Sequence, residues 1–374
     1  MRYYIVTTTK FADPCLDYLT YGASQSNWLA NINVADIVFL SQFSYKSQNL
    51  FGPLRVNRSL FYNKDIIYPQ QKYFYRIQFE PVEEIKAIEE TDLYLKGIQS
   101  KDIALFVRII NLIQQNKHLH CITLTNDEGK AIFETFQQIG LNYDKNLRKN
   151  KLVNELQAIN CEYLWNKNRL DKRKIFSSES DLEAYLILSL KNPNSREYNN
   201  LSKLLNKYEG NHLQLSEVYN QFIFGNAYPS DVVILNESNI NILELKKGKF
   251  TQNMFQQLEK EIKKHLYYSM FSDRVKSICN AKRFNFYLVC SKDSDNVKFK
   301  RSIIEKYCDL CRRIGSIREN TITFVEYSVK DNEVLFEEIW IRTLAYSFAK
   351  ISRRIWFLKS IKSSEIFSSV EIFR

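Results

Sequence analysis

The stretch PSDVVILNESNINILELK, residues 229–246, decides the fold of the second half of the chain. It contains two strand-like runs, 231–236 and 240–246, that are rich in Val, Ile and Leu. Apolar runs on either side of a short polar turn predict a β-hairpin. Because the runs are apolar at almost every position, we expect the hairpin strands to be buried.

The register of this hairpin places three charged residues on one face. If Asn236 pairs with Asn239 across the turn, Asp231 falls directly opposite Glu244. Side chains at opposed positions of antiparallel strands share a face, with Cβ atoms about 5 Å apart. Lys246 follows Glu244 by two residues and therefore points to the same side. The sequence thus predicts two carboxylates and one ammonium group together on an apolar ribbon.

This arrangement suits metal-dependent hydrolysis of phosphodiesters. Two carboxylates supply the hard oxygen ligands that Mg²⁺ prefers, and Mn²⁺ is expected to substitute for it. A bound divalent ion polarises a phosphate and lowers the pKa of an attacking water, and an ammonium group stabilises the charge that develops. We therefore expect Asp231 and Glu244 to be metal ligands and Lys246 to be the third catalytic residue. The alternative is a salt-bridged hairpin whose polar face lies in water, which the apolar flanking positions disfavour.

Segments around the hairpin alternate between helical and strand-like patterns. The expected elements are helix 181–190, the two hairpin strands, helix 252–270, strand 284–290, helix 298–313 and strand 321–327. Strands that alternate with helices predict a mixed sheet flanked by helices. The tail, 341–374, carries seven Lys or Arg and two Glu on an aromatic-rich, partly helical pattern.

The hairpin motif resembles that of the PD-(D/E)XK nuclease superfamily. Pro229-Ser230-Asp231 is followed by twelve residues and then by Glu244-Leu245-Lys246. The resemblance covers about 178–330 and extends to the order helix, strand, strand, helix, strand. It implies a mixed-sheet, restriction-endonuclease-like domain over 179–374 and a metal-dependent deoxyribonuclease activity.

The resemblance adds two candidate catalytic residues. The superfamily often has a carboxylate on its first core helix, and Glu183 matches it as a metal ligand. Ser180-x-x-Glu183 is also a capping box, in which Glu183 would bond the Ser180 amide, so both roles stay open. Related nucleases place a Gln on the helix after the lysine, where Gln257 fits better than its neighbour Gln256.

Basic residues exceed acidic ones across the whole chain. Lys and Arg total 53 against 42 Asp and Glu, a net charge of +11, which suits an anionic partner such as nucleic acid. Close to the hairpin, Lys247, Lys249, Lys260 and Lys264 are expected to contact a DNA backbone. The alternative is that these lysines only form the solvated face of helix 252–270.

The first half of the chain is strand-rich at its start. Short β-branched or aromatic runs predict strands at 3–8, 35–41, 50–56 and 73–79. Helical spacing then predicts helices over 100–116 and 127–139. The polar stretch 143–178 has Leu152, Leu156 and Ile159 spaced for one helical face and is interpreted as a helical connector.

Aromatic residues are dense between the first strands, and an aromatic pocket is a plausible site for a flipped base. Blocks such as Tyr21-Gly22-Ala-Ser24, Leu50-Phe51-Gly52-Pro and Tyr68-Pro69 follow one another in an order that resembles an EVE domain of the PUA-like superfamily. The resemblance implies a β-barrel domain over 1–142 that reads a modified base. Tyr21 and Tyr68 stand where the family usually has Trp, which leaves the ligand open. The expected pocket residues are Tyr21, Ser24, Asn27, Trp28, Phe43 and Tyr68.

Together the two halves predict a modification-dependent restriction endonuclease. Its partner would be double-stranded DNA with a modified base, modified cytosine being favoured, and cutting both strands implies a homodimer. No G-x-x-x-x-G-K-[ST] motif occurs, so metal alone should support cleavage. The alternatives are a repair or structure-specific nuclease that ignores modification, and a reader of modified nucleic acid that does not cut.

Other signals point to a cytoplasmic protein without a membrane partner. No apolar run approaches the roughly 20 residues that span a bilayer, and the start reads as a strand rather than a signal peptide. The seven cysteines form no disulfide framework, and the four histidines show no arrangement typical of serine or cysteine hydrolases.

Overall fold

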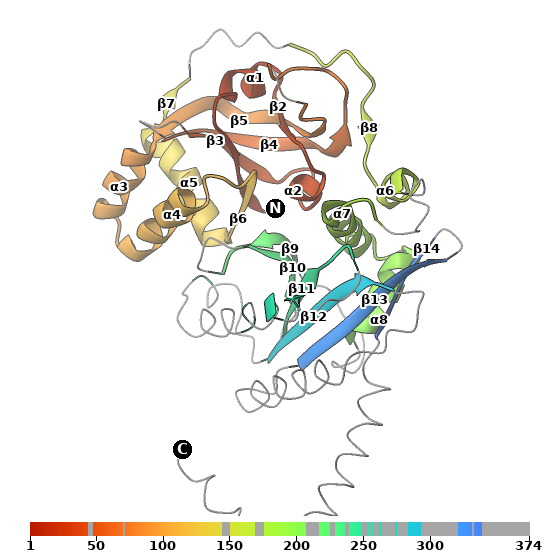
Figure 1. Ribbon diagram of the computed structural model, residues 1–374. Coiled ribbons are helices and arrows are strands. Elements are labelled where there is room, and N and C mark those ends of the chain that lie inside the picture. Colours follow the sequence, from red (N-terminus) through yellow and green to blue (C-terminus); the bar gives the residue numbers. More distant parts are fainter. Residues whose placement is uncertain are drawn as a thin grey trace, which may run out of the picture.

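Two mixed β-sheets with helices packed on them form the protein (Figure 1). The computed structural model describes residues 1–43, 48–69, 72–143, 150–168, 176–206, 217–224, 229–235, 239–248, 283–292, 321–330 and 333–338, together with Asn253, Met254, Gln256, Gln257, Lys260, Ile262 and Arg274. The expected class, helices combined with mixed sheets, is confirmed. Among the described residues, no helix has the length and apolar character needed to cross a membrane.

The first sheet is curled into half a barrel and built mostly from antiparallel pairs (Figure 1). Along its main path the strands are ordered β2-β5-β4-β3-β1-β6, and β1 and β3 pair in parallel. Register shifts in the long β4–β5 pair, at Gly52/Leu54 for example, mark bulges that bend the sheet. The strands are β1 (Tyr3–Thr8), β2 (Thr20–Ala23), β3 (Ile37–Phe43), β4 (Gln48–Tyr62), β5 (Tyr75–Glu89), β6 (Cys121–Leu124), β7 (Leu141–Asn142) and β8 (Gln157–Ala158).

Five helices accompany this sheet among the described residues, and three of them pack on one side of it (Figure 1). Helix α5 begins at a capping box in which Thr125 and Glu128 each accept from the other's backbone amide. Helix α4, whose existence the helical spacing predicted, buries Phe106, Ile110 and Ile113, whereas Ile103 and Val107 are exposed. The helices are α1 (Ala12–Asp17), α2 (Asn27–Ala30), α3 (Glu90–Gln99), α4 (Ile103–Gln115) and α5 (Asn126–Ile139).

The connector differs from its prediction. Residues 150–156 are not helical and β8 pairs with β4; within the described parts of this stretch, 150–168 and 176–178, the helix is α6 (Cys161–Asn168). The helix expected through Leu152, Leu156 and Ile159 is therefore wrong. Residues 157 and 158 pair with Phe61 and Tyr62 of β4, and this tertiary contact overrides the weak helical preference of a short polar segment.

The second sheet contains the predicted hairpin. Its order is β14-β13-β12-β11-β10-β9, with β11, β12 and β13 parallel to one another and the outer pairs antiparallel. In the hairpin, Val232 pairs with Leu243 and Leu235 with Ile240, so the register predicted from the turn is confirmed. The strands are β9 (Glu217–Phe222), β10 (Ser230–Leu235), β11 (Asn239–Leu245), β12 (Arg283–Ser291), β13 (Thr321–Lys330) and β14 (Glu333–Glu338).

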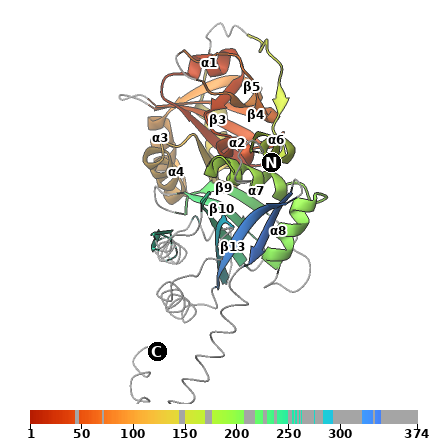
Figure 2. The same cartoon turned by 45° about the vertical axis from the view of Figure 1, so that its right-hand side comes forward.

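Helix α7 (Glu179–Leu190) lies between the two sheets, as Figures 1 and 2 both show. Its side chains from Asp181 to Ile187 are all buried, so no polar stripe faces solvent there. A helix that is buried all round belongs to the interior of a larger structure. Helix α8 (Arg196–Asn206) packs beside β14 on the second sheet. Predicted helix 298–313 and tail 341–374 lie outside the described residues.

The two halves share a tightly bonded seam. Arg274 is buried, lies over the Phe222 ring and donates to the Glu128 carboxylate at 3.2 Å. It also donates to the carbonyl oxygens of Ile223 and Thr123. Because Glu128 and Thr123 come from the first half, this guanidinium joins α5 and β6 to the second half.

We predict that Arg274→Ala lowers the free energy of unfolding by about 3 kcal/mol, because it leaves the buried Glu128 carboxylate with Arg108 as its one remaining cation among the described residues. Lys292→Ala removes an exposed ion pair with Glu337, whose side chains are 42% and 54% exposed, and should cost under about 1 kcal/mol. Denaturant unfolding of both variants checks the difference. Equal losses would contradict this account of the seam.

Candidate functional site

Asp231 and Glu244 lie at the end of the hairpin, where β10 and β11 stop pairing. The last ladder pair is Val232 with Leu243, so Asp231 is opposite Glu244, as predicted. The Leu245 amide finds no ladder partner there and donates to Asp231 Oδ2 at 2.8 Å. This bond fixes the Asp231 carboxylate over the start of the loop that carries the lysine.

Lys246 joins the two carboxylates from the first residue after β11. Its backbone amide donates to Val289 on β12 at 2.8 Å, which holds the residue against the sheet. Its ammonium Nζ is 2.9 Å from Glu244 Oε1 and 3.3 Å from Glu179 Oε1. Burial alone would lower the pKa of Lys246, but the nearby carboxylates of Glu244, Asp231 and Glu179 outweigh it and raise the pKa. The lysine is therefore charged at neutral pH.

Glu183 completes the cluster from helix α7 and does not cap the helix. The N-cap of α7 is Ser178, whose hydroxyl accepts from the Asp181 amide. Glu183 instead accepts from Asn27 Nδ2 at 2.8 Å and from Gln221 Nε2 at 2.7 Å. Of the two roles that the sequence left open for Glu183, the structure favours a place in the carboxylate cluster.

The cluster holds more negative charge than its surroundings neutralise. Burial, followed by repulsion from Glu244 and Glu183, raises the pKa of Asp231 well above its usual range. Burial likewise raises the pKa of Glu183 to about 8, with repulsion from Glu179 and Glu244 adding to it. Protons or a cation are thus favoured at this position.

Carboxylate oxygens of this kind are the ligands that Mg²⁺ and Mn²⁺ prefer, and the excess negative charge would favour such an ion. Among the described residues, however, no group of three or more His, Cys, Asp or Glu side chains stands arranged as a metal site. Amides and the Lys246 ammonium are bonded to the oxygens instead. The carboxylate oxygens still have the donor chemistry that a divalent ion prefers, although amides and an ammonium group are bonded to them in this structure. Asp231, Glu244 and Glu183 are the side chains that would hold the ion.

Gln257 and one predicted lysine lie beside the cluster. Gln257 Nε2 donates to Glu244 Oε1 at 3.0 Å, which places this residue where the resemblance put it. Lys247 Nζ donates to the Ser177 carbonyl at 2.6 Å, close to Glu179. Lys260 is exposed on a helical stretch. Lys249 and Lys264 lie outside the described residues.

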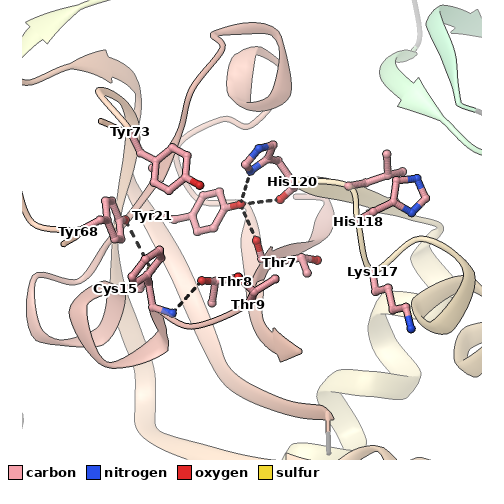
Figure 3. Close-up of a pocket in the computed structure, with 13 residues that line it drawn as sticks. Thr7, Thr8, Thr9, Cys15, Tyr21, Tyr68, Tyr73, Lys117, His118 and His120 are labelled. Atoms are coloured by element: carbon pink, nitrogen blue, oxygen red, sulfur yellow. Dashed lines mark hydrogen bonds between the residues drawn. The ribbon is translucent and has the colours of Figure 1, made fainter. Parts of the chain in front are cut away.

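An aromatic pocket of about 110 Å³ opens in the first half of the chain (Figure 3). Two of the predicted residues, Tyr21 and Tyr68, line it, and both are almost fully buried. The Tyr21 hydroxyl is anchored between Thr7 and His120, with the Thr7 carbonyl at 2.8 Å. The Tyr73 ring lies 5.3 Å from Tyr68 and 5.9 Å from His120, which closes the aromatic wall.

The other predicted pocket residues lie elsewhere. The Trp28 ring stands behind the pocket, 5.7 Å from the ring of His120. Ser24 is exposed and does not line the pocket. Phe43 lies under the Lys117 ammonium, with 4.2 Å from Nζ to the ring centroid. Asn27 reaches the carboxylate cluster instead.

Three residues that the sequence did not single out contribute to these sites: His120 and Tyr73 at the pocket, and Gln221 at the carboxylates. The sequence did contain one signal, since Lys117-His118-Leu119-His120 is a cluster of polar rings and charge directly before a buried strand. Gln221 gave no signal, because β9 was not predicted as a strand.

Comparisons with known proteins add little. No family model matches the chain, and no curated protein matches it. Among solved structures, a crystal structure of a Pseudomonas putida protein aligns with 36% of this chain and 98% of its own, at 14% identity and a TM-score of 0.26. A similarity at that level carries no argument about fold or function.

We predict that Glu183→Gln stabilises the protein in EDTA, and more so at pH 9 than at pH 5. The folded Glu183 has a pKa of about 8 against an ordinary value of 4.5. Between these values the unfolded chain loses a proton that the folded chain keeps, so wild-type stability falls as pH rises. The substitution removes this loss of folding stability, which is on the order of 2–4 kcal/mol above pH 8. The new amide can donate to Asn27 Oδ1, which has no partner among the described residues.

Thermal unfolding across this pH range measures the effect. Glu179→Gln is the matched control, since Glu179 lies on the same helix with its side chain 45% exposed and should show no such gain. If the stability gain of Glu183→Gln over wild type is the same at pH 5 and pH 9, then burial does not destabilise the ionised carboxylate.

Proposed function

We propose that this protein is a Mg²⁺-dependent DNA endonuclease that locates a modified base with its first half and cuts with its second. The observation that carries the proposal is the convergence of Asp231, Glu244, Glu183 and the Lys246 ammonium at one end of a buried hairpin. Buried carboxylates whose pKa values are raised by one another are costly, and such clusters occur mainly at functional sites.

The chemistry follows from the donor set. Asp231, Glu244 and Glu183 would hold Mg²⁺, or Mn²⁺ in its place, which supplies charge to the scissile phosphate and an activated water. The Lys246 ammonium stays charged and lies beside Glu244, so it can stabilise negative charge that develops on the phosphate oxygens. Gln257 donates through its amide to the same Glu244 oxygen, Oε1, and helps to orient it.

Basic residues around the site suit a DNA backbone. Lys247 lies next to the cluster, Lys260 is exposed on a helical stretch, and the whole chain carries a net charge of +11. Lys249 and Lys264, proposed for the same role, follow in sequence. Contacts of this kind make affinity fall steeply with salt.

The aromatic pocket supports a reading role for residues 1–142. An apolar cavity of about 150 Å³ holds one benzene ring. A pocket of about 110 Å³ with an open side therefore suits the single ring of a pyrimidine better than the double ring of a purine. Burial lowers the pKa of His120, so its ring is neutral, and Nε2, the ring nitrogen that is not bonded to Tyr21, can donate or accept one hydrogen bond with a base edge. A modified cytosine is the proposed ligand.

Several features support the two family resemblances, which remain proposals. The curled sheet of the first half suits a PUA-like barrel of the EVE type. The hairpin that continues into parallel β12 suits the PD-(D/E)XK order, with 143–178 as connector and 179–374 as the nuclease part. Cleavage of both strands of a duplex would need two copies of the site, hence a homodimer.

We predict that the wild-type protein with Mg²⁺ cuts duplexes that carry methylated, hydroxymethylated or glucosylated cytosine, and that Lys246→Ala lowers the rate at least about 100-fold, since one charge-stabilising group is worth that much. Gel analysis of matched modified and plain duplexes measures both effects. Equal cutting of all duplexes would indicate a nuclease that ignores modification. Binding of the modified duplex without any cutting would indicate a reader only.

We predict that Tyr73→Ala lowers the affinity advantage of modified over plain duplex by about tenfold, because a stacked base loses one aromatic wall. Competition binding in EDTA measures this without cleavage. Tyr94→Ala, an aromatic residue of α3 that is 44% exposed and outside the pocket, should leave the advantage unchanged. An unaltered advantage in the Tyr73 variant would remove the pocket from the proposal.

A further inference from the structure

Helix α2 brings two neighbouring residues of the first half to both candidate sites. The Trp28 ring lies 5.7 Å from the His120 ring, which lines the aromatic pocket. The preceding residue, Asn27, donates from Nδ2 to Glu183 Oε2 at 2.8 Å. A residue of the half assigned to base reading is therefore bonded to a carboxylate of the half assigned to cutting.

The bond to Glu183 is the one side-chain hydrogen bond that Asn27 makes among the described residues. Its Oδ1 is buried without a partner, and the residue is 4% exposed. A buried amide costs free energy unless its groups are bonded. General packing does not require an asparagine here, whereas a carboxyl group that must be held in one orientation does require a donor.

Gln221 repeats this arrangement from β9. Its Nε2 donates to Glu183 Oε1 at 2.7 Å and lies 3.5 Å from Asp231 Oδ1. Gln221 has a φ of 49°, in the left-handed region that residues other than glycine rarely adopt. Observed strain of this kind is concentrated at functional sites. Asn220, the residue before Gln221, donates from its side chain to the Asn27 carbonyl. Asn27 and the strand that carries Gln221 are therefore bonded to each other directly.

We propose that Asn27 and Gln221 are positioning residues that hold the two oxygens of Glu183 in place toward a divalent ion, so that the first half completes the nuclease site. The inference rests on the proposed function. Both side-chain amides are uncharged and are weak metal ligands. Each hydrogen bond leaves further lone pairs of Glu183 free to bind the ion. Outer partners that orient a metal-ligating carboxylate are typically worth 10–100-fold in metal affinity or activity.

The experiment uses the full chain and four proteins: wild type, Asn27→Ala, Gln221→Ala and Asn31→Ala. Asn31 is the matched control, because it follows the same short helix, is 2% exposed and has a side chain without a partner among the described residues. Calorimetric titration with Mg²⁺ alone measures metal affinity without DNA. Steady-state cleavage of a modified duplex separates kcat from KM, and binding of that duplex in EDTA reports on the pocket.

We expect Asn27→Ala and Gln221→Ala each to weaken Mg²⁺ binding and to lower kcat by about 10–100-fold, with KM and duplex binding in EDTA unchanged. Asn31→Ala should match wild type in every assay. The inference alone is overturned if Asn27→Ala binds Mg²⁺ and cuts as well as a wild type that does both. It is also overturned if Asn31→Ala loses as much Mg²⁺ affinity and kcat as Asn27→Ala. A wild-type protein that neither binds Mg²⁺ nor cuts overturns both this inference and the proposed function.

Discussion

Repulsion among buried carboxylates is the constraint around which the second half is organised. Burial raises the pKa of Asp231 and of Glu183, Glu244 raises both further, and Glu183 adds to the shift of Asp231. The Lys246 ammonium lies directly against Glu244. An arrangement like this destabilises a fold unless other groups offset it. The offset comes from donors that stay neutral: the Leu245 amide and the side-chain amides of Asn27, Gln221 and Gln257. The fold thus keeps the carboxylates close together at a cost in stability, and the proposed metal-dependent reaction would account for that cost.

These donors come from both halves, and the halves are correspondingly inseparable. One apolar cluster runs from Tyr4 and Val38 in the first half to Val232 and Tyr287 in the second. The polar part of the same seam is less complete, because Ser26 Oγ, Asn27 Oδ1 and Asn220 Oδ1 are buried without partners among the described residues. An interface selected only for stability would replace such groups by apolar ones. Their presence beside Glu183 ties the polar part of the seam to the site rather than to folding.

The sequence predicted what depends on local spacing. The register expected from the sequence agrees with the pairs from Val232–Leu243 to Leu235–Ile240, and this register brings Asp231 opposite Glu244. The rest depended on tertiary contacts. Strand β9 is short, contains polar residues on both faces and has no strand periodicity, so Gln221 could not be placed. Asn27 lies among aromatic residues in the sequence and was assigned to the pocket, although a four-residue helix directs it to the other half. The connector was expected to be helical because Leu152, Leu156 and Ile159 share a helical face, whereas pairing with β4 decides its conformation.

The shortness of α2 bears on how the two sites relate. A helix of four residues has no stability of its own, since nucleation alone costs more than its few hydrogen bonds return. Its position is therefore set by what it touches: His120 through Trp28 on one side, and Glu183 and Asn220 through Asn27 on the other. A displacement of α2 would therefore alter the contacts at His120 and at Glu183 together. The pocket and the carboxylates are, on this geometry, two ends of one element rather than two modules joined by a linker.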